Sequence, residues 1–439
     1  MRNKYVTDVR HGAGARDACG GKLHSVMPPW SLVRSRNIQR FLGAQALSLL
    51  GESMQQVALS WLIFRYTNSA AMLGVAGCLS SLPAAIAVPF AGAFADRRHP
   101  RRIVVANQLA WALPAFGLAL LAALGGETVT ALIVAMCALG FINGVDTPVR
   151  QMFVARLVES KAELGSAVSL HSVVYDGTRM LGPALGGYIL AKLSELPIFT
   201  ATALCHALAA VLLLSIRMHE EAPALATQPV SRALADVFGY ALQVRPVMAI
   251  LVLSAVIGFA GSSYMVLLPV MAAVLHGGPN TLGLLWSAIG FGAIAGGLVL
   301  SARRGSRGYG ELIAAGVVLF ASGILVFSLS RTLGVSLLAL GIGGLGLTLM
   351  VVSCNTALLT ITEPAMHGRV LSLFTLSYMA TAPAGNLYIG FLASKISAPG
   401  AISVNGAVSL LAASVFLTQV PSLRRLARAD GRLGLPSAG

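Results

Sequence analysis

The chain has 439 residues, of which 56% are hydrophobic and only 11% are charged. Soluble domains carry about 25% charged residues, so this composition argues against a soluble enzyme, a disordered chain and a nucleic-acid-binding module. The net charge of +15 fits a membrane protein instead, because the cytoplasmic loops of such proteins collect Lys and Arg.

Apolar runs long enough to cross a bilayer occur twelve times along the chain, at about 20 residues per crossing helix. Each run is continuous rather than alternating, which predicts helices and excludes a β-barrel. We therefore expect an all-α polytopic membrane protein with twelve transmembrane helices. The runs cover about 39–63, 70–94, 103–124, 128–149, 166–190, 197–216, 247–275, 282–302, 311–330, 333–357, 370–393 and 401–420.

The basic residues lie mainly in one set of loops and in both tails. This set includes Arg97, Arg98, Arg101 and Arg102 after the second run, and Arg424, Arg425, Arg428 and Arg432 near the C-terminus. The opposite set of loops holds only Arg65, Lys192, Arg331 and Lys395. The positive-inside rule places the first set and both termini in the cytoplasm, which agrees with an even number of spans.

The two halves of the chain resemble each other. Residues 165–191 and 368–393 share a Gly and a Ser-Leu pair near their start and a Pro with small residues later. Such a repeat indicates a duplicated six-helix unit, a frequent construction in secondary transporters. We expect a cytoplasmic basic tail at 1–37, a six-helix bundle at 38–216, a cytoplasmic linker at 217–246, a second bundle at 247–420 and a basic tail at 421–439.

The segment between the second and third runs carries a recognisable pattern. Gly92, Asp96 and Arg97 are followed by Arg101 and Arg102. This resembles the G-x-x-x-D-R-x-x-R-R signature of the major facilitator superfamily, although the basic pair lies one place later here and His99 replaces the usual Gly.

Other segments resemble one bacterial branch of that superfamily, the exporters related to the enterobactin exporter. They are Gly51-Glu52, the stretch from Pro148 to Gln151, the stretch from Arg179 to Gly187, the Pro269 region and the stretch from Gly368 to Val370. The resemblance covers about 36–420. It implies two six-helix bundles that rock about a central cavity, and export of an organic molecule driven by the proton gradient.

Glu52 is an acidic residue near the middle of the first run. Gln45, Ser48, Glu52 and Gln55 share one helical face by their spacing. Ionisable groups inside a bilayer usually face the bundle interior and mark a transport path. We expect Glu52 to carry a proton or contact the substrate, with Gln55 beside it; the alternative is a hydrogen-bonded clamp between helices.

The fifth run contains Asp176 and Arg179, three residues apart and able to pair. In one interpretation the pair is a switch, in which protonation of Asp176 frees Arg179 to bind an anionic or phenolic group. In the other, the pair is permanent and only cancels two charges. Tyr264 and Tyr378 are further residues that can contact an aromatic substrate.

The signature residues Gly92, Asp96, Arg97, Arg101 and Arg102 lie at the cytoplasmic edge of the second and third runs. We expect a gate in which charged contacts between helix ends close the inner face. The alternative for the arginines is simple positive-inside anchoring.

Asp146 and Arg150 are four residues apart at the inner end of the fourth run and can pair in the same way. Pro148 lies between them, and a local structural role is the favoured interpretation of this pair.

The leading hypothesis is a proton-coupled exporter of a small organic compound, of siderophore or drug type, in a bacterial inner membrane. The alternatives are a proton-linked nutrient importer, a passive channel and a membrane-embedded enzyme. We expect a monomer that binds its substrate, protons and lipid but no nucleic acid. No metal or other cofactor is expected, and no phosphate-binding motif of an ATP-driven pump occurs.

Overall fold

The computed structural model describes residues 35–96, 99–157, 161–216, 238–242, 244–303, 308–363 and 366–419. Throughout these ranges the regular structure is helical, which confirms the predicted all-α membrane fold. The first half contains α2 (Arg36–Thr67), α3 (Ala70–Asp96), α4 (Pro100–Ala123), α5 (Val129–Leu157), α6 (Lys161–Lys192) and α7 (Glu195–Leu214). The second half contains α9 (Arg245–Val256), a π-helix η1 (Ile257–Gly261), a 3₁₀-helix η2 (Ser263–Leu267), α10 (Leu268–Val274), α11 (Pro279–Ser301), α12 (Tyr309–Leu329), α13 (Leu333–Ile361), α14 (His367–Ile396) and α15 (Ala398–Leu417).

Nine segments of the described ranges are long and apolar enough to cross a bilayer. The long helices α2, α6 and α14 fall outside this group because polar side chains interrupt their apolar sequence. The expected count of twelve therefore stays a prediction.

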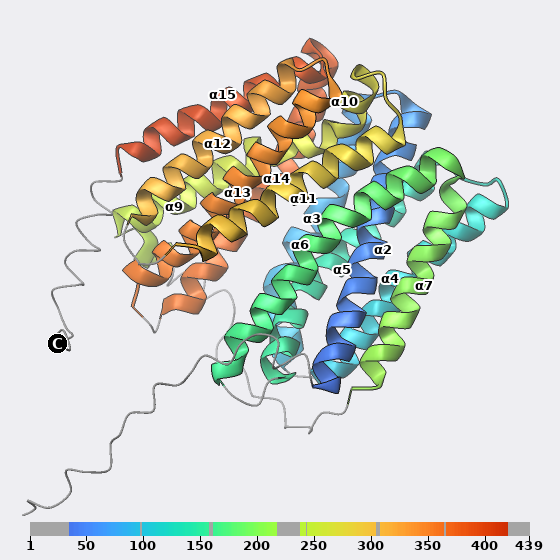
Figure 1. The fold of residues 1–439 in the computed structure, drawn as a ribbon, viewed down its shortest axis with the longest axis horizontal. Helices are drawn as coiled ribbons and strands as arrows, with labels where there is room; N and C mark the ends of the chain where they lie inside the picture. The colour runs from blue at the N-terminus through green and yellow to red at the C-terminus, as the bar shows by residue number, and fades with distance from the viewer. Residues whose placement is uncertain are drawn as a thin grey trace, which may run out of the picture.

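The helices form two groups that meet along two pairs of helices. Figure 1 shows α2 to α7 together, in blue to green, beside α9 to α15, in yellow to red. Helix α3 packs on α14 and helix α6 packs on α11 across the boundary between the groups. Most of the predicted tails, and the predicted linker up to residue 237, lie outside the described residues, so the predicted domain limits remain expectations.

The two groups approach most closely in the parts of α3, α6, α11 and α14 that lie farthest from the basic loops. A Cβ added at Gly283 of α11 would lie 2.3 Å from the carbonyl oxygen of Pro183 in α6. A Cβ at Gly390 of α14 would lie 2.6 Å from the Cα of Gly74 in α3. Only glycine allows backbones to come this close, as in small-residue contacts between membrane helices. This end of the molecule is therefore closed.

The seventh run, predicted as one continuous helix over about 247–275, is broken in its middle. The π-helix and the 3₁₀-helix separate α9 from α10. A π-helical turn leaves backbone groups without their usual partners. Asn405 of α15 compensates, because its Nδ2 donates to the Ala260 carbonyl at 2.7 Å and to the Ser263 hydroxyl at 3.0 Å. The break is thus fixed by a side chain from another helix, which the local sequence of the run does not contain.

Replacing Asn405 with Leu is expected to destabilise the fold. The buried Ala260 carbonyl would lose its shorter hydrogen bond and keep only the one from the Ser263 hydroxyl at 3.3 Å. Weakening a buried polar contact in this way costs about 1 kcal/mol. Thermal unfolding of the purified protein in detergent measures the effect. Ser414→Leu, on an exposed face of the same helix, is the control and should unfold at the wild-type temperature. Equal unfolding temperatures for both variants would contradict this role of Asn405.

Candidate functional site

A cavity of about 290 Å³ lies between the two groups of helices. The first half contributes polar residues from α2, α3 and α5, and the second half contributes α14 through Tyr378, Met379 and Ala382. The cavity lies next to the closed end, because Ser80 and Ser81 follow the glycine contacts of α3 by one to two turns. Its polar lining consists of Glu52, Gln55, Gln56, Ser80, Ser81, Asn143 and Tyr378.

The polar face of α2 divides into two parts. Glu52 and Gln55 line the cavity, as expected for a transport path. Gln45 and Ser48 are buried one to two turns away and accept hydrogen bonds from Nη1 of Arg150, at 2.7 and 3.0 Å. The hydrogen-bonded clamp, one of the two alternatives for this face, is therefore present in its Gln45–Ser48 part, and a transport path at Glu52 and Gln55 stays a prediction.

Gln55 and Trp111 are polar groups of the cavity wall that lack partners. Gln55 is 1% exposed, and neither its Oε1 nor its Nε2 has a hydrogen-bond partner. The indole Nε1 of Trp111 is buried without a partner too, although its ring stacks on His206 with centroids 5.3 Å apart. Because buried polar groups are almost always hydrogen-bonded, these atoms are open polar contacts in the wall of the cavity.

Arg179 lies near the cavity but does not form the expected ion pair with Asp176. No ion pair joins these residues within the described part of the chain. The guanidinium instead lies over the Tyr175 ring, with its Cζ 5.5 Å from the ring centroid. Glu52 and Tyr378 are close enough to Arg179 to interact electrostatically. Asp176 interacts electrostatically with Arg179 as well, although it is outside the residues that line the cavity.

Tyr378 and Tyr264, both considered as aromatic contacts, take different places. Tyr378 lines the cavity from the second half. Tyr264 is 1% exposed and packs against Phe320 and Phe327 with centroid distances of 6.3 and 6.5 Å. Tyr378 is therefore the tyrosine that a substrate in the cavity can reach.

Asp146 and Arg150 form the ion pair that their spacing predicted, despite Pro148 between them. Both are buried, and Asn107 of α4 donates to Asp146. With the bonds from Arg150 to Gln45 and Ser48, this network joins α2, α4 and α5. It holds the first group of helices together on the basic-loop side of Glu52.

Replacing Arg150 with Met should destabilise the first group of helices by about 3–5 kcal/mol, because the Asp146 charge would remain buried without its cation. Thermal unfolding in detergent provides the measurement. The double variant Asp146→Asn with Arg150→Met removes both charges and should recover part of the loss. An Arg150→Met protein as stable as wild type would show that the pair has no structural role.

The superfamily signature falls largely outside the described side chains. Gly92 and Asp96 belong to the end of α3, but their side chains are not described, and Arg97 lies outside the described residues. Arg101 donates to the Leu214 carbonyl at the end of α7. Arg40 donates to the neighbouring Ser215 carbonyl at 2.6 Å. Arg102 is exposed. Cations are favourable at a helix C-terminus, so Arg101 also has a packing role; the gate remains a prediction.

Asn386 is a residue of the site that sequence reasoning missed. Its Nδ2 donates to the Gly77 carbonyl at 3.1 Å and to the Ser81 hydroxyl at 3.2 Å, and so joins α14 to α3 above the cavity. Gln56, Asn143 and Trp111 were missed as cavity residues as well. A polar residue three places after Pro383 in an apolar helix is the signal that points to Asn386.

Comparison with known proteins gives a family match over nearly the whole chain. Residues 27–432 match the family described as transmembrane secretion effector. The staphyloferrin A transporter of Staphylococcus aureus (strain NCTC 8325 / PS 47) is 27% identical over 264 residues. That match covers 59% of this chain and 66% of the relative, just under two thirds of its length.

Solved structures with the same fold are transporters. A bacterial homologue of the human lysosomal transporter Spinster, inward-facing and unoccupied, matches with a TM-score of 0.66 and 13% identity, over 94% of this chain and 100% of that one. The nucleoside transporter NupG matches with a TM-score of 0.69 and 12% identity, over 86% and 99% of the two chains. At these identities the likeness concerns the fold alone.

Proposed function

Since this chain belongs to the transmembrane secretion effector family of the major facilitator superfamily, we propose that it exports a small organic compound of the siderophore type in exchange for protons. The family and fold are those of multi-pass transporters of small molecules, not of enzymes. Export, proton coupling and the substrate class are the parts that we propose. The observation that carries them is a cavity between the two halves with one carboxyl group, Glu52, in its wall.

Glu52 is the proposed proton carrier. A carboxyl in a confined cavity can take up and release a proton as its surroundings change, and Glu52 is the acidic residue that lines this cavity. Arg179 is the proposed anchor for an anionic group of the substrate, because its charge lies near Glu52 and Tyr378. Proton and substrate then compete for Glu52: an ionised Glu52 accepts a hydrogen bond from the substrate, and a protonated Glu52 releases the substrate.

The proposed cycle alternates between two closures. In the structure, the glycine contacts of α3 with α14 and of α6 with α11 close the end away from the basic loops. We propose that the basic loops and both termini are cytoplasmic, so that this state receives substrate from the cytoplasm of a bacterial cell. The opposite state would close at the signature residues Gly92, Asp96, Arg97, Arg101 and Arg102, and would take protons from outside.

Direction and substrate can be tested together in vesicles with a known orientation. Staphyloferrin A, the compound in the name of the relative in Staphylococcus aureus, is the first probe. Inside-out vesicles with an acidic interior should accumulate it, and collapse of the pH gradient should stop the accumulation. Accumulation by right-side-out vesicles alone would favour the proton-linked importer. Transport of an unrelated drug but not of this probe would support proton-coupled export and contradict the proposed siderophore-type substrate.

A further inference from the structure

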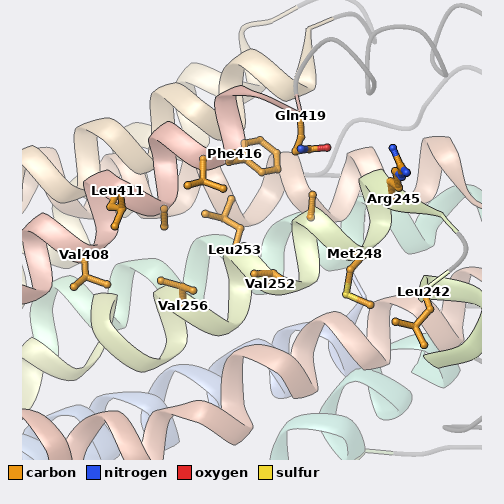
Figure 2. A pocket seen from close by; sticks show the side chains of 13 residues that line it. Leu242, Arg245, Met248, Val252, Leu253, Val256, Val408, Leu411, Phe416 and Gln419 are labelled. Carbon is orange, nitrogen blue, oxygen red and sulfur yellow. The ribbon is translucent and has the colours of Figure 1, made fainter.

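A second concave site lies on the outer surface of the protein, between α9 and α15. Its volume is about 660 Å³, larger than that of the central cavity, with which it shares no lining residue. Figure 2 shows Met248, Val252 and Val256 of α9 facing Val408 and Leu411 of α15 along its length. The apolar side chains here are open: Val252 is 53% and Leu411 is 66% exposed. In a chain that crosses a membrane, such a face meets lipid.

The length of this groove matches one leaflet of a bilayer. Its α9 wall extends from Arg245 to Val256 and its α15 wall from Val408 to Gln419, eleven steps along each helix. At about 1.5 Å per residue, each wall is roughly 17 Å long. The hydrocarbon core of a bilayer is about 30 Å thick, so one leaflet contributes roughly 15 Å. The groove therefore extends from the membrane surface to about the midplane, where the π-helix begins directly after Val256.

The surface end of the groove is positively charged. Arg245 lies there, as Figure 2 shows, on the first turn of α9. It is exposed, and no described residue forms a hydrogen bond or an ion pair with its guanidinium. The N-terminus of α9 adds the positive end of a helix dipole to the same place. The far end of the groove, at Val256 and Val408, is apolar.

We propose that this groove binds one anionic phospholipid from the leaflet on the side of the basic loops. Its phosphate would pair with Arg245, and one acyl chain would lie between α9 and α15. The charge complementarity at one end and the one-leaflet length together select this occupant. Neither a second copy of the protein nor a substrate molecule is required to have the length of one leaflet and a negative charge at the membrane surface.

The bond from Asn405 to Ala260 closes α15 onto the second half just beyond the inner end of the groove. Lipid in the groove therefore lies directly beside the broken helix. The site is independent of the transported substrate, and its test can fail while the proposed export function holds.

Native mass spectrometry of the full-length protein tests the proposal, after reconstitution with equal amounts of phosphatidylglycerol and phosphatidylcholine. Wild type should retain one phosphatidylglycerol per chain, several-fold more often than phosphatidylcholine. Arg245→Ala should lose this preference, whereas Arg36→Ala, which removes an exposed arginine from the same end of the first half, should keep it. Ala412→Trp fills the groove and should reduce retention of both lipids; Ala407→Trp, on an exposed face of α15 outside the groove, should not.

Retention of phosphatidylglycerol by Arg245→Ala at the level of Arg36→Ala would overturn the proposal. Equal retention of the two lipids by wild type would also overturn it. So would a mass spectrum in which wild type is a dimer without bound lipid. If Ala412→Trp does not fold, the comparison of the two arginine variants still decides the outcome.

Discussion

Vesicles that contain Glu52→Gln are expected to show no substrate transport driven by a pH gradient. Glutamine has nearly the same shape as glutamate and keeps a polar side chain in the cavity, but it cannot carry a proton. In the proposed cycle Glu52 links proton uptake to substrate release, so coupled transport should fall to the level of vesicles without protein. The initial rate of substrate accumulation after an imposed pH jump is the measurement.

Two matched variants separate this effect from a general loss of charge. Glu195→Gln removes a carboxyl that pairs with Arg65 at 3.0 Å at the closed end of the molecule, and it should transport like wild type. Asp176→Asn should have a smaller effect than Glu52→Gln, because Asp176 does not line the cavity. Full pH-driven transport by Glu52→Gln would remove Glu52 from the mechanism.

Gly283→Ala is expected to open the closed end of the molecule. Alanine is usually favourable in a helix, by about 1 kcal/mol relative to glycine. Here its Cβ would lie 2.3 Å from the Pro183 carbonyl oxygen and 3.1 Å from the Cα of Gly187, so α6 and α11 must move apart. Overpacking costs about 1–3 kcal/mol, and each 1.4 kcal/mol changes a population ratio about tenfold.

Spin labels at Lys192 and Asn280 measure this opening, because these exposed residues lie at the adjacent ends of α6 and α11. In Gly283→Ala the distance distribution should shift to longer values. Gly297→Ala is the control on the same helix, since a Cβ at Gly297 has no neighbour within 4 Å. An unchanged distribution in Gly283→Ala would mean that the glycine contact does not hold this end closed.

Much of the architecture can be predicted from the sequence because the membrane imposes a simple rule. Every backbone polar group in the hydrocarbon must be bonded within its own helix, so long apolar runs indicate helices directly. The same rule explains why Glu52 and Gln55 were found: a polar stripe on an apolar helix must face away from lipid. Spacing alone also gave the Asp146–Arg150 pair.

The remaining features depend on partners far away in the sequence. The break after Val256 depends on Asn405, which is more than a hundred residues away in the sequence. Asn405 can donate its hydrogen bond to the Ala260 carbonyl only when α15 packs beside α9. Asn386 lines up with Gly77 and Ser81 only when the two halves meet. Arg179 is the exception, because its contact is local: the guanidinium lies over the Tyr175 ring on the same helix, and residue spacing alone does not decide between Tyr175 and Asp176.

The most direct test of alternating access uses a single cysteine at Gln56, an exposed residue in the cavity wall, in a variant without the five native cysteines. A membrane-impermeant thiol reagent is added to one side of oriented vesicles at a time. In the protein with the native Gly283, whose end away from the basic loops is closed, we predict labelling from the side of the basic loops. Once Gly283→Ala is introduced, we predict labelling from the opposite side. Labelling from one side alone in both proteins, or from neither side, would contradict a central cavity that opens to each side in turn.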